Sequence, residues 1–247
     1  MSQTKHKIFD HLVETEKLFA SGRVDFKVIE GQHGGLLSYL PSADFNLIRL
    51  GSLDADFINE LKEQKVSFTC FSKENIEEFF ENFTVSQGFE SSYVLEANLY
   101  SNLENFNYAP DANIKIEKIT DLEGLKKFDH IASIAFKSPE GFPFEIAKTV
   151  TNHPDLNFFL AYIDGNLAGC GLLSIIDGVA GLYWDGVLPE YRRQGIGAEL
   201  VKHRMDYARK KGSKSICAQN MESSKNYYHR IGFKPSGTLS MYSCNVA

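Results

Sequence analysis

The sequence has few cysteines and no long apolar run. Its four cysteines, Cys70, Cys170, Cys217 and Cys244, lie far apart in apolar or strand-like surroundings. They show neither the paired short spacing of a zinc site nor the density of a disulfide-rich secreted domain, so we expect reduced thiols and no bound metal. No stretch of about 18 apolar residues is present, and the N-terminus lacks the apolar core of a signal peptide. These absences predict a soluble, cytoplasmic protein without a membrane partner.

Basic residues are also in short supply. The chain has 26 Lys and Arg residues against 32 Asp and Glu residues, a formal net charge of -6. A surface of this sign favours neither nucleic acid nor anionic membranes as partners, so any anion site must be local. The 43% content of hydrophobic residues over 247 positions is enough for the core of one large domain or two small ones.

The first part of the chain alternates helix-like and strand-like patterns. Helices are expected near residues 8–19, 53–61 and 73–87, and strands near residues 66–72 and 91–99. Residues 100–111 lack either period and carry Asn, Pro and Asp, which indicates a boundary. We therefore predict an α/β domain over residues 1–109 and a second domain over residues 110–247.

The second part restarts with a strand and ends with a strand. Asp164-Gly165 joins two apolar strands and suits a tight hairpin turn. A strand–helix–strand unit follows, with its helix predicted over residues 195–211. Further strands are expected near residues 113–119, 179–188, 214–220 and 237–246, and further helices near residues 121–135, 144–150 and 223–231. The pattern predicts an α/β fold of the α+β type, with a mixed, mostly antiparallel sheet flanked by helices.

The junction "VLPEYRRQGIGAEL", residues 187–200, leads from a strand into the long helix. A helix N-terminus presents unpaired backbone N–H groups and a partial positive charge, which together attract anions. Gly195 and Gly197 leave the backbone accessible, and Arg192 and Arg193 add cationic donors. This combination favours a diphosphate ligand.

Two common phosphate loops do not fit the junction. A dinucleotide fingerprint needs a third glycine where Leu200 stands, and a nucleoside-triphosphate loop needs lysine and a hydroxyl residue where Ala198 and Glu199 stand. The pattern that fits is R-x-x-G-x-G, carried by Arg192, Gly195 and Gly197. Here the chain resembles the GNAT superfamily of N-acetyltransferases, in which such a loop holds the pyrophosphate of acyl-CoA.

A second signature of the same family follows at the expected distance. The segment "QNMESSKNYYHRIGF" resembles a strand ending in Asn, a short helix and Tyr-x-x-x-Gly-Phe, carried by Asn220, Tyr228, Gly232 and Phe233. Ser224 takes the place of the small residue before the helix, with one extra residue between it and Asn220, so the capping geometry departs from the family pattern. The resemblance covers residues 112–247.

The resemblance implies acetyl-CoA as the co-substrate and no metal. Backbone groups of Val187 and Leu188 would line the pantetheine arm, and those from Arg193 to Ala198 would bind the diphosphate. The cofactor-binding set implied by the two signatures is Val187, Leu188, Arg192, Arg193, Gln194, Gly195, Ile196, Gly197, Ala198, Asn220 and Ser224.

The resemblance also implies direct attack of an amine on the thioester, without an acyl-enzyme. Tyr228 would protonate the departing thiolate, which is reasonable because a phenol has a pKa near 10 and a thiol one of about 8.5. The attacking amine must first lose a proton, and Asp185 is the candidate base. The alternative is that Asp185, before Gly186, is an ordinary polar residue at a strand end. Trp184 and Tyr183 are candidates for lining the acceptor pocket, or for the core.

Two questions stay open at this level. The N-terminal part repeats the order strand, helix, Gly-Phe and strand with Thr84 at the place of Tyr228, so it is either a degenerate copy of the GNAT fold without CoA binding or an unrelated α/β domain. The leading function is acetyl transfer to a primary amine of a small molecule, peptide or protein. The alternative is a non-catalytic acyl-CoA-binding or interaction protein. The segment Lys137–Glu145, expected on the acceptor side, names no acceptor by its composition.

Overall fold

The chain forms two compact units that alternate along the sequence. The computed structural model describes residues 2–21, 27–30, 36–39, 47–50, 68–72, 89–221 and 224–244. One unit comprises residues 1–97, 220–223 and 235–247, and the other comprises residues 98–219 and 224–234. The division at residue 109 stays a prediction, because each unit draws on more than one stretch of the chain.

The first unit contains a long helix and a mixed sheet. The helix α1 (Ser2–Ala20) buries Ile8, Leu12 and Phe19, as the helical spacing of these residues predicts. The strand order is β1-β2-β3-β4-β11-β5, in which β3 and β4 are parallel, and β1–β2, β2–β3 and β4–β11 are antiparallel. The strands are β1 (Lys27–Glu30), β2 (Leu36–Tyr39), β3 (Leu47–Leu50), β4 (Phe68–Ser72), β5 (Phe89–Tyr100) and β11 (Lys234–Cys244). The helices predicted near residues 53–61 and 73–87, and Thr84, lie outside the described residues.

The second unit is built on the strand order β10-β9-β8-β7-β6. All neighbours are antiparallel except β9 and β10, which are parallel and are joined by the crossover helix α6. The predicted mixed, mostly antiparallel sheet is thus confirmed. Its strands are β6 (Ile114–Lys118), β7 (Leu156–Ile163), β8 (Asn166–Ile176), β9 (Val179–Val187) and β10 (Ser215–Asn220).

Two Asp-Gly pairs make the turns of this sheet. In the predicted hairpin turn Asp164 has φ +50° and Gly165 φ +79°, and in the next turn Asp177 has φ +50° and Gly178 φ +75°. Positive φ at both central residues is the geometry whose twist matches that of the flanking strands. The two turns set the register of β7, β8 and β9.

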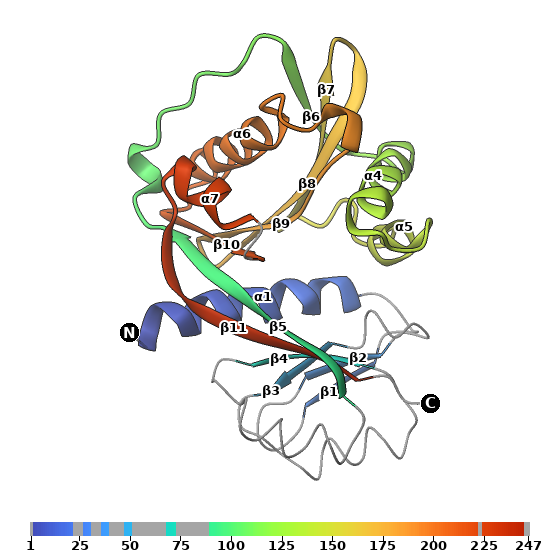
Figure 1. Ribbon diagram of the computed structural model, residues 1–247, viewed down its shortest axis with the longest axis vertical. Coiled ribbons are helices and arrows are strands. Elements are labelled where there is room, and N and C mark those ends of the chain that lie inside the picture. Colours follow the sequence, from blue (N-terminus) through green and yellow to red (C-terminus); the bar gives the residue numbers. More distant parts are fainter. Residues whose placement is uncertain are drawn as a thin grey trace. The chain divides into compact units, whose positions relative to one another are not determined.

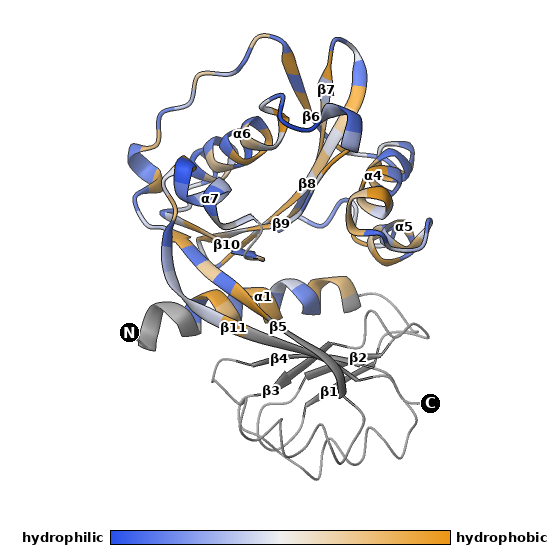
Figure 2. Cartoon of the chain, viewed as in Figure 1, coloured by the Kyte–Doolittle hydropathy of each residue, from blue (hydrophilic) through white to orange (hydrophobic). Residues whose placement is uncertain are grey.

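Helices cover both faces of the sheet in the second unit (Figure 1). On one face lie α4 (Leu122–Phe136) and α5 (Phe142–Ala147), and on the other lie α6 (Ile196–Lys210) and α7 (Lys225–Ile231). Figure 2 shows the pattern behind this arrangement, with apolar residues concentrated on β7 and β8 and polar residues frequent on α6. The apolar side of α6 is buried, as helical spacing of its apolar residues requires: Ile196, Leu200, Val201, Met205 and Ala208.

Other expectations from composition concern thiols and membranes. Cys170 and Cys217 are free and buried, as expected for reduced thiols. Among the helices of the described residues, none combines the length and the hydropathy needed to cross a bilayer.

Candidate functional site

The junction between β9 and α6 is an exposed loop with two left-handed residues. After β9 comes a short 3₁₀ helix, η3 (Pro189–Tyr191), and then Arg193 with φ +62° and Gly195 with φ +84°. Residues 192–195 are exposed. No backbone carbonyl among the described residues accepts a hydrogen bond from the N–H groups of residues 193–198. The loop therefore presents a series of free donors at the positive end of α6.

Side chains of the loop fold back on its own backbone. Arg192 Nε donates to the Val187 carbonyl at 3.1 Å, and Gln194 Nε2 donates to the Glu190 carbonyl at 3.1 Å. The remaining N–H groups of the Arg192 guanidinium are left for a ligand. By contrast, Leu188 uses its N–H on the Ala168 carbonyl and accepts from Tyr191 N, each at 3.0 Å. The backbone of Leu188 is thus largely occupied within the fold.

A bulge shapes the end of β9. Cys170 pairs with Gly186 and Leu172 pairs with Tyr183, so that Gly171 alone opposes Trp184 and Asp185. Trp184 adopts φ +53°, which is unusual for an aromatic residue outside a turn or bulge. The described register with β10 ends at Leu182, before the bulge. The last residues of β9 thus run beyond their pairing with β10.

A buried arginine on α6, which the sequence analysis missed, holds this bulge. Arg204 is fully buried; it donates from Nη1 to the Leu172 carbonyl at 2.8 Å and forms an ion pair with Asp185. Its Nη1 also lies 3.4 Å from the Tyr183 carbonyl. A Cβ on Gly171 would lie 2.6 Å from Arg204 Cζ, so only glycine leaves room for the guanidinium. Arg204 lies on the buried side of α6. A charged residue at such a position is the sequence signal that points to a buried ion pair.

The structure brings the two candidate catalytic residues together. Tyr228 is buried on α7, and its hydroxyl donates to Asp185 Oδ2 at 2.6 Å. The other carboxylate oxygen of Asp185 is paired with Arg204. Burial, followed by the nearby carboxylate of Asp185, raises the pKa of Tyr228 well above its usual value of 10. The phenol therefore keeps its proton throughout the neutral range.

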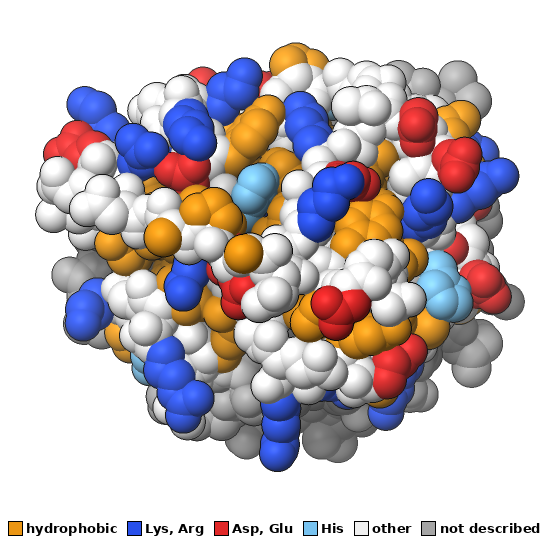
Figure 3. Space-filling view, turned by 90° about the horizontal axis from the view of Figure 1, so that it is seen from above, with side chains coloured by type: hydrophobic (Ala, Val, Ile, Leu, Met, Phe, Trp, Pro, Cys, Tyr) orange, Lys and Arg blue, Asp and Glu red, His pale blue; other side chains and the backbone are white. Residues whose placement is uncertain are grey.

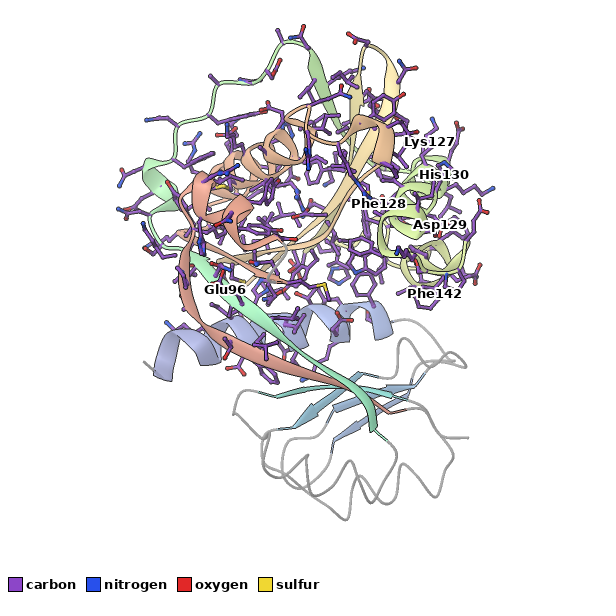
Figure 4. All side chains as sticks on the ribbon, in the orientation of Figure 1. Glu96, Lys127, Phe128, Asp129, His130 and Phe142 are labelled. Carbon is purple, nitrogen blue, oxygen red and sulfur yellow. The ribbon has the colours of Figure 1, made fainter. Side chains whose placement is uncertain are left out.

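Helices α4 and α5, on the face of the sheet opposite α6, carry an aromatic contact and a capping carboxylate. Phe128 points from α4 towards the sheet (Figure 4), and its ring lies 5.8 Å from that of Trp184, between centroids. Asp129 accepts from Gly141 N and Phe144 N, at 2.9 Å each. Asp129 thereby fixes the start of α5 and the segment Lys137–Glu145 that precedes and enters it.

The remaining predicted binding residues lie around α7. Asn220 ends β10, and its side-chain amide donates to the Met221 carbonyl at 3.0 Å. Ser224 stands at the N-cap of α7, but its side chain makes no capping hydrogen bond. This agrees with the extra residue that the sequence places before the helix.

Charges of both signs are mixed on one face of the molecule, and the described residues form no metal cluster. Lysine, arginine and acidic side chains are interspersed on the face seen in Figure 3, with no field of one sign. Within the described part of the chain, no group of three His, Cys, Asp or Glu side chains is arranged to hold a metal ion.

The Acetyltransferase (GNAT) family profile matches residues 125–233. This range includes most of α4, the bulge, the exposed loop and Tyr228. Residues 125–233 therefore belong to a GNAT acetyltransferase domain. The resemblance inferred from the two signatures is thereby confirmed, and with it acyl transfer as the general chemistry of the family.

The comparison with a relative agrees with this assignment. The chain is similar to the uncharacterized N-acetyltransferase YobR of Bacillus subtilis (strain 168), with 31% identity over 85 residues; these are 33% of this chain and 34% of YobR. The chain thus spans about a third of the length of that relative.

Two solved structures share the fold over nearly the whole chain. A GCN5-related N-acetyltransferase from Kribbella flavida has a TM-score of 0.69 at 14% identity, covering 99% of this chain and 96% of its own. A conserved protein of unknown function from Staphylococcus epidermidis ATCC 12228 also has a TM-score of 0.69, at 17% identity, covering 93% and 98%. At these identities the likeness concerns the fold alone. The idea that the N-terminal part is a degenerate GNAT copy stays a prediction.

Proposed function

We propose that this protein is an N-acetyltransferase that moves the acetyl group of acetyl-CoA directly to a primary amine. The observation that supports the proposal is the hydrogen bond from Tyr228 to Asp185, which joins the phenol of the proposed acid to the carboxylate of the proposed base. The exposed loop before α6 adds the anion site that a CoA donor requires.

The loop fits the diphosphate of acetyl-CoA. The N–H groups of residues 193–198 have no carbonyl partner among the described residues, and Gly195, at φ +84°, carries no Cβ that would keep a phosphate away from them. Arg192 and Arg193 would neutralise the phosphate charge. The backbone of Val187 would bind the pantetheine arm. Leu188 could contribute only the carbonyl lone pair that Tyr191 N leaves unused.

Tyr228 is proposed as the acid that protonates the thiolate. Its raised pKa keeps the phenol protonated at neutral pH, so the proton is available in every molecule. The hydrogen bond to Asp185 fixes the hydroxyl until a better acceptor arrives. Acetyl-CoA supplies the activated acyl group, and no protein nucleophile is required.

Asp185 is proposed as the acceptor of the proton that the amine must lose. An ionised carboxylate offers about four acceptor sites, and the described contacts occupy one on each oxygen. Trp184, held against Phe128 on the other face, is proposed to border the acceptor side together with the α5 segment fixed by Asp129.

The test is release of free CoA from acetyl-CoA over a panel of amines that includes small amines, amino acids, peptides and a lysine-rich protein. We expect turnover with at least one class. Binding of acetyl-CoA in calorimetry without turnover on any acceptor would favour the alternative, a non-catalytic acyl-CoA-binding protein. No binding at millimolar acetyl-CoA would contradict both.

A further inference from the structure

The hydroxyl of Tyr227, next to the proposed acid, is buried without a hydrogen-bond partner. Tyr227 lies on α7, and its ring meets that of Tyr228 edge-on, with centroids 5.0 Å apart. None of the described side-chain or backbone groups accepts from or donates to its Oη. A buried hydroxyl left unpaired costs about 1–3 kcal/mol, so its retention requires a reason.

The position of this hydroxyl points to the start of α6. A Cβ on Gly197 would lie 3.1 Å from Tyr227 Oη, so the phenol rests against the first turn of the helix. The same turn contains N–H groups that no described carbonyl accepts. Backbone N–H groups and the Tyr227 hydroxyl therefore lie close together at the start of α6. None of these donors has an acceptor among the described residues.

The nearest charged groups do not satisfy the phenol. Asp185 interacts with Tyr227 through charge alone, because no hydrogen bond joins the two side chains. Burial is the main cause that raises the pKa of Tyr227 far above its usual value of 10, followed by the charge of Asp185. The hydroxyl consequently remains a donor, and what it lacks is an acceptor.

We infer that Tyr227 donates its hydroxyl hydrogen bond to the diphosphate of bound acyl-CoA, completing the anion site at the N-terminus of α6. This inference rests on the proposed function and adds a side-chain ligand to it. Glycine at position 197 is then needed because a side chain there would push the phenol away from the loop.

The experiment compares Tyr227→Phe with the wild-type chain, and uses Tyr228→Phe on the same helix as the matched control. Without ligand, Tyr227→Phe should melt at the same temperature as wild type or higher, since an unpaired hydroxyl is removed. Tyr228→Phe should melt lower, since it loses a hydrogen bond. In calorimetry with CoA, Tyr227→Phe should bind about ten- to a hundred-fold more weakly, the range expected for a hydrogen bond to a charged group.

Phosphorus NMR of the CoA complexes locates the contact. The two diphosphate resonances of bound CoA should differ between wild type and Tyr227→Phe, whereas the 3′-phosphate resonance should not. Unchanged affinity, or a weaker complex with unchanged diphosphate resonances, would overturn the inference. Lower melting of unliganded Tyr227→Phe would also overturn it, because the hydroxyl would then have a partner within the protein. Failure of the wild-type chain to bind CoA would instead contradict the proposed function.

Discussion

At the scale of single residues, the phenol of Tyr228 has the most specific expected role. Tyr228→Phe keeps the ring that packs in the core and removes only the proton donor. We expect kcat to fall about 10²- to 10⁴-fold, the range for loss of a general acid, with acetyl-CoA affinity close to that of wild type. Steady-state kinetics and calorimetry measure the two quantities. Wild-type kcat in Tyr228→Phe would exclude the acid role.

The ionisation of Tyr228 gives a second test at this scale. Its pKa is raised in the folded state above the usual value of 10, by burial and by Asp185. The stabilisation from this group is therefore complete below pH 10 and is lost as pH rises through the folded pKa. In an ultraviolet tyrosinate titration, wild type and Tyr228→Phe should show the same absorbance change up to pH 10. A Tyr228-dependent step below that pH would contradict the burial of the phenol.

Arg204 is expected to dominate the stability of the bulge. Arg204→Met retains a long apolar side chain, but it leaves Asp185 without its cation and the Leu172 carbonyl without its donor. Breaking a buried ion pair from one side costs about 3–5 kcal/mol of the free energy of unfolding. The more exposed Arg209 provides the control. Its partner Asp206 also pairs with Lys210, so Arg209→Met should cost no more than about 1 kcal/mol. Urea unfolding measures both, and equal losses would refute the special place of Arg204.

At the scale of elements, the start of α6 depends on one backbone conformation. Gly195 has φ +84° and nothing within 4 Å of an added Cβ, so Gly195→Val strains the backbone without a clash. Gly178 has φ +75° in a hairpin turn and is equally open, so Gly178→Val is a matched control. Each variant should lose about 1–2 kcal/mol of stability. Only Gly195→Val should abolish acetyl-CoA binding in calorimetry, and retained binding would show that the loop is not the anion site.

Regular elements and the loop could be predicted from the sequence, whereas the bulge could not. The apolar stripe of α6, the turn at Asp164-Gly165 and the glycine spacing before α6 are local patterns, and local patterns determine local geometry. The bulge at Trp184 depends on Gly171 and Arg204, which meet only after β8 and α6 have packed together. No period along the chain reports such a contact. For the same reason the sequence does not predict the hydrogen bond between Tyr228 and Asp185, although it indicates both residues as catalytic candidates.

Glu199 illustrates the same limit. From the sequence alone, Glu199 indicates only that the junction is not a nucleoside-triphosphate loop. In the structure it is buried, and its Oε1 accepts from Tyr108 Oη at 2.5 Å and from Asp111 N at 2.9 Å. The segment around residues 100–111, predicted as a boundary, is thus attached to the first turns of α6 by a partner about 90 residues away.

At the scale of the whole molecule, ligand binding should protect one unit. Hydrogen exchange with and without acetyl-CoA should show lower deuterium uptake in residues 187–198, where the free N–H groups of the loop gain acceptors. Uptake in α1 should stay the same, since that helix belongs to the other unit. Protection confined to α1, with none in the loop, would contradict the proposed location of the site.

The close approach of Arg204 to Gly171 couples two positions that lie far apart in the chain. Because a Cβ at 171 would lie 2.6 Å from the guanidinium carbon, residue 171 cannot gain a side chain while Arg204 is kept. Gly171→Ala alone should be disruptive, yet it should be tolerated in a chain that carries a smaller residue at 204. Substitutions here would therefore be accepted in a fixed order during evolution or protein engineering, with the arginine lost first and the glycine second.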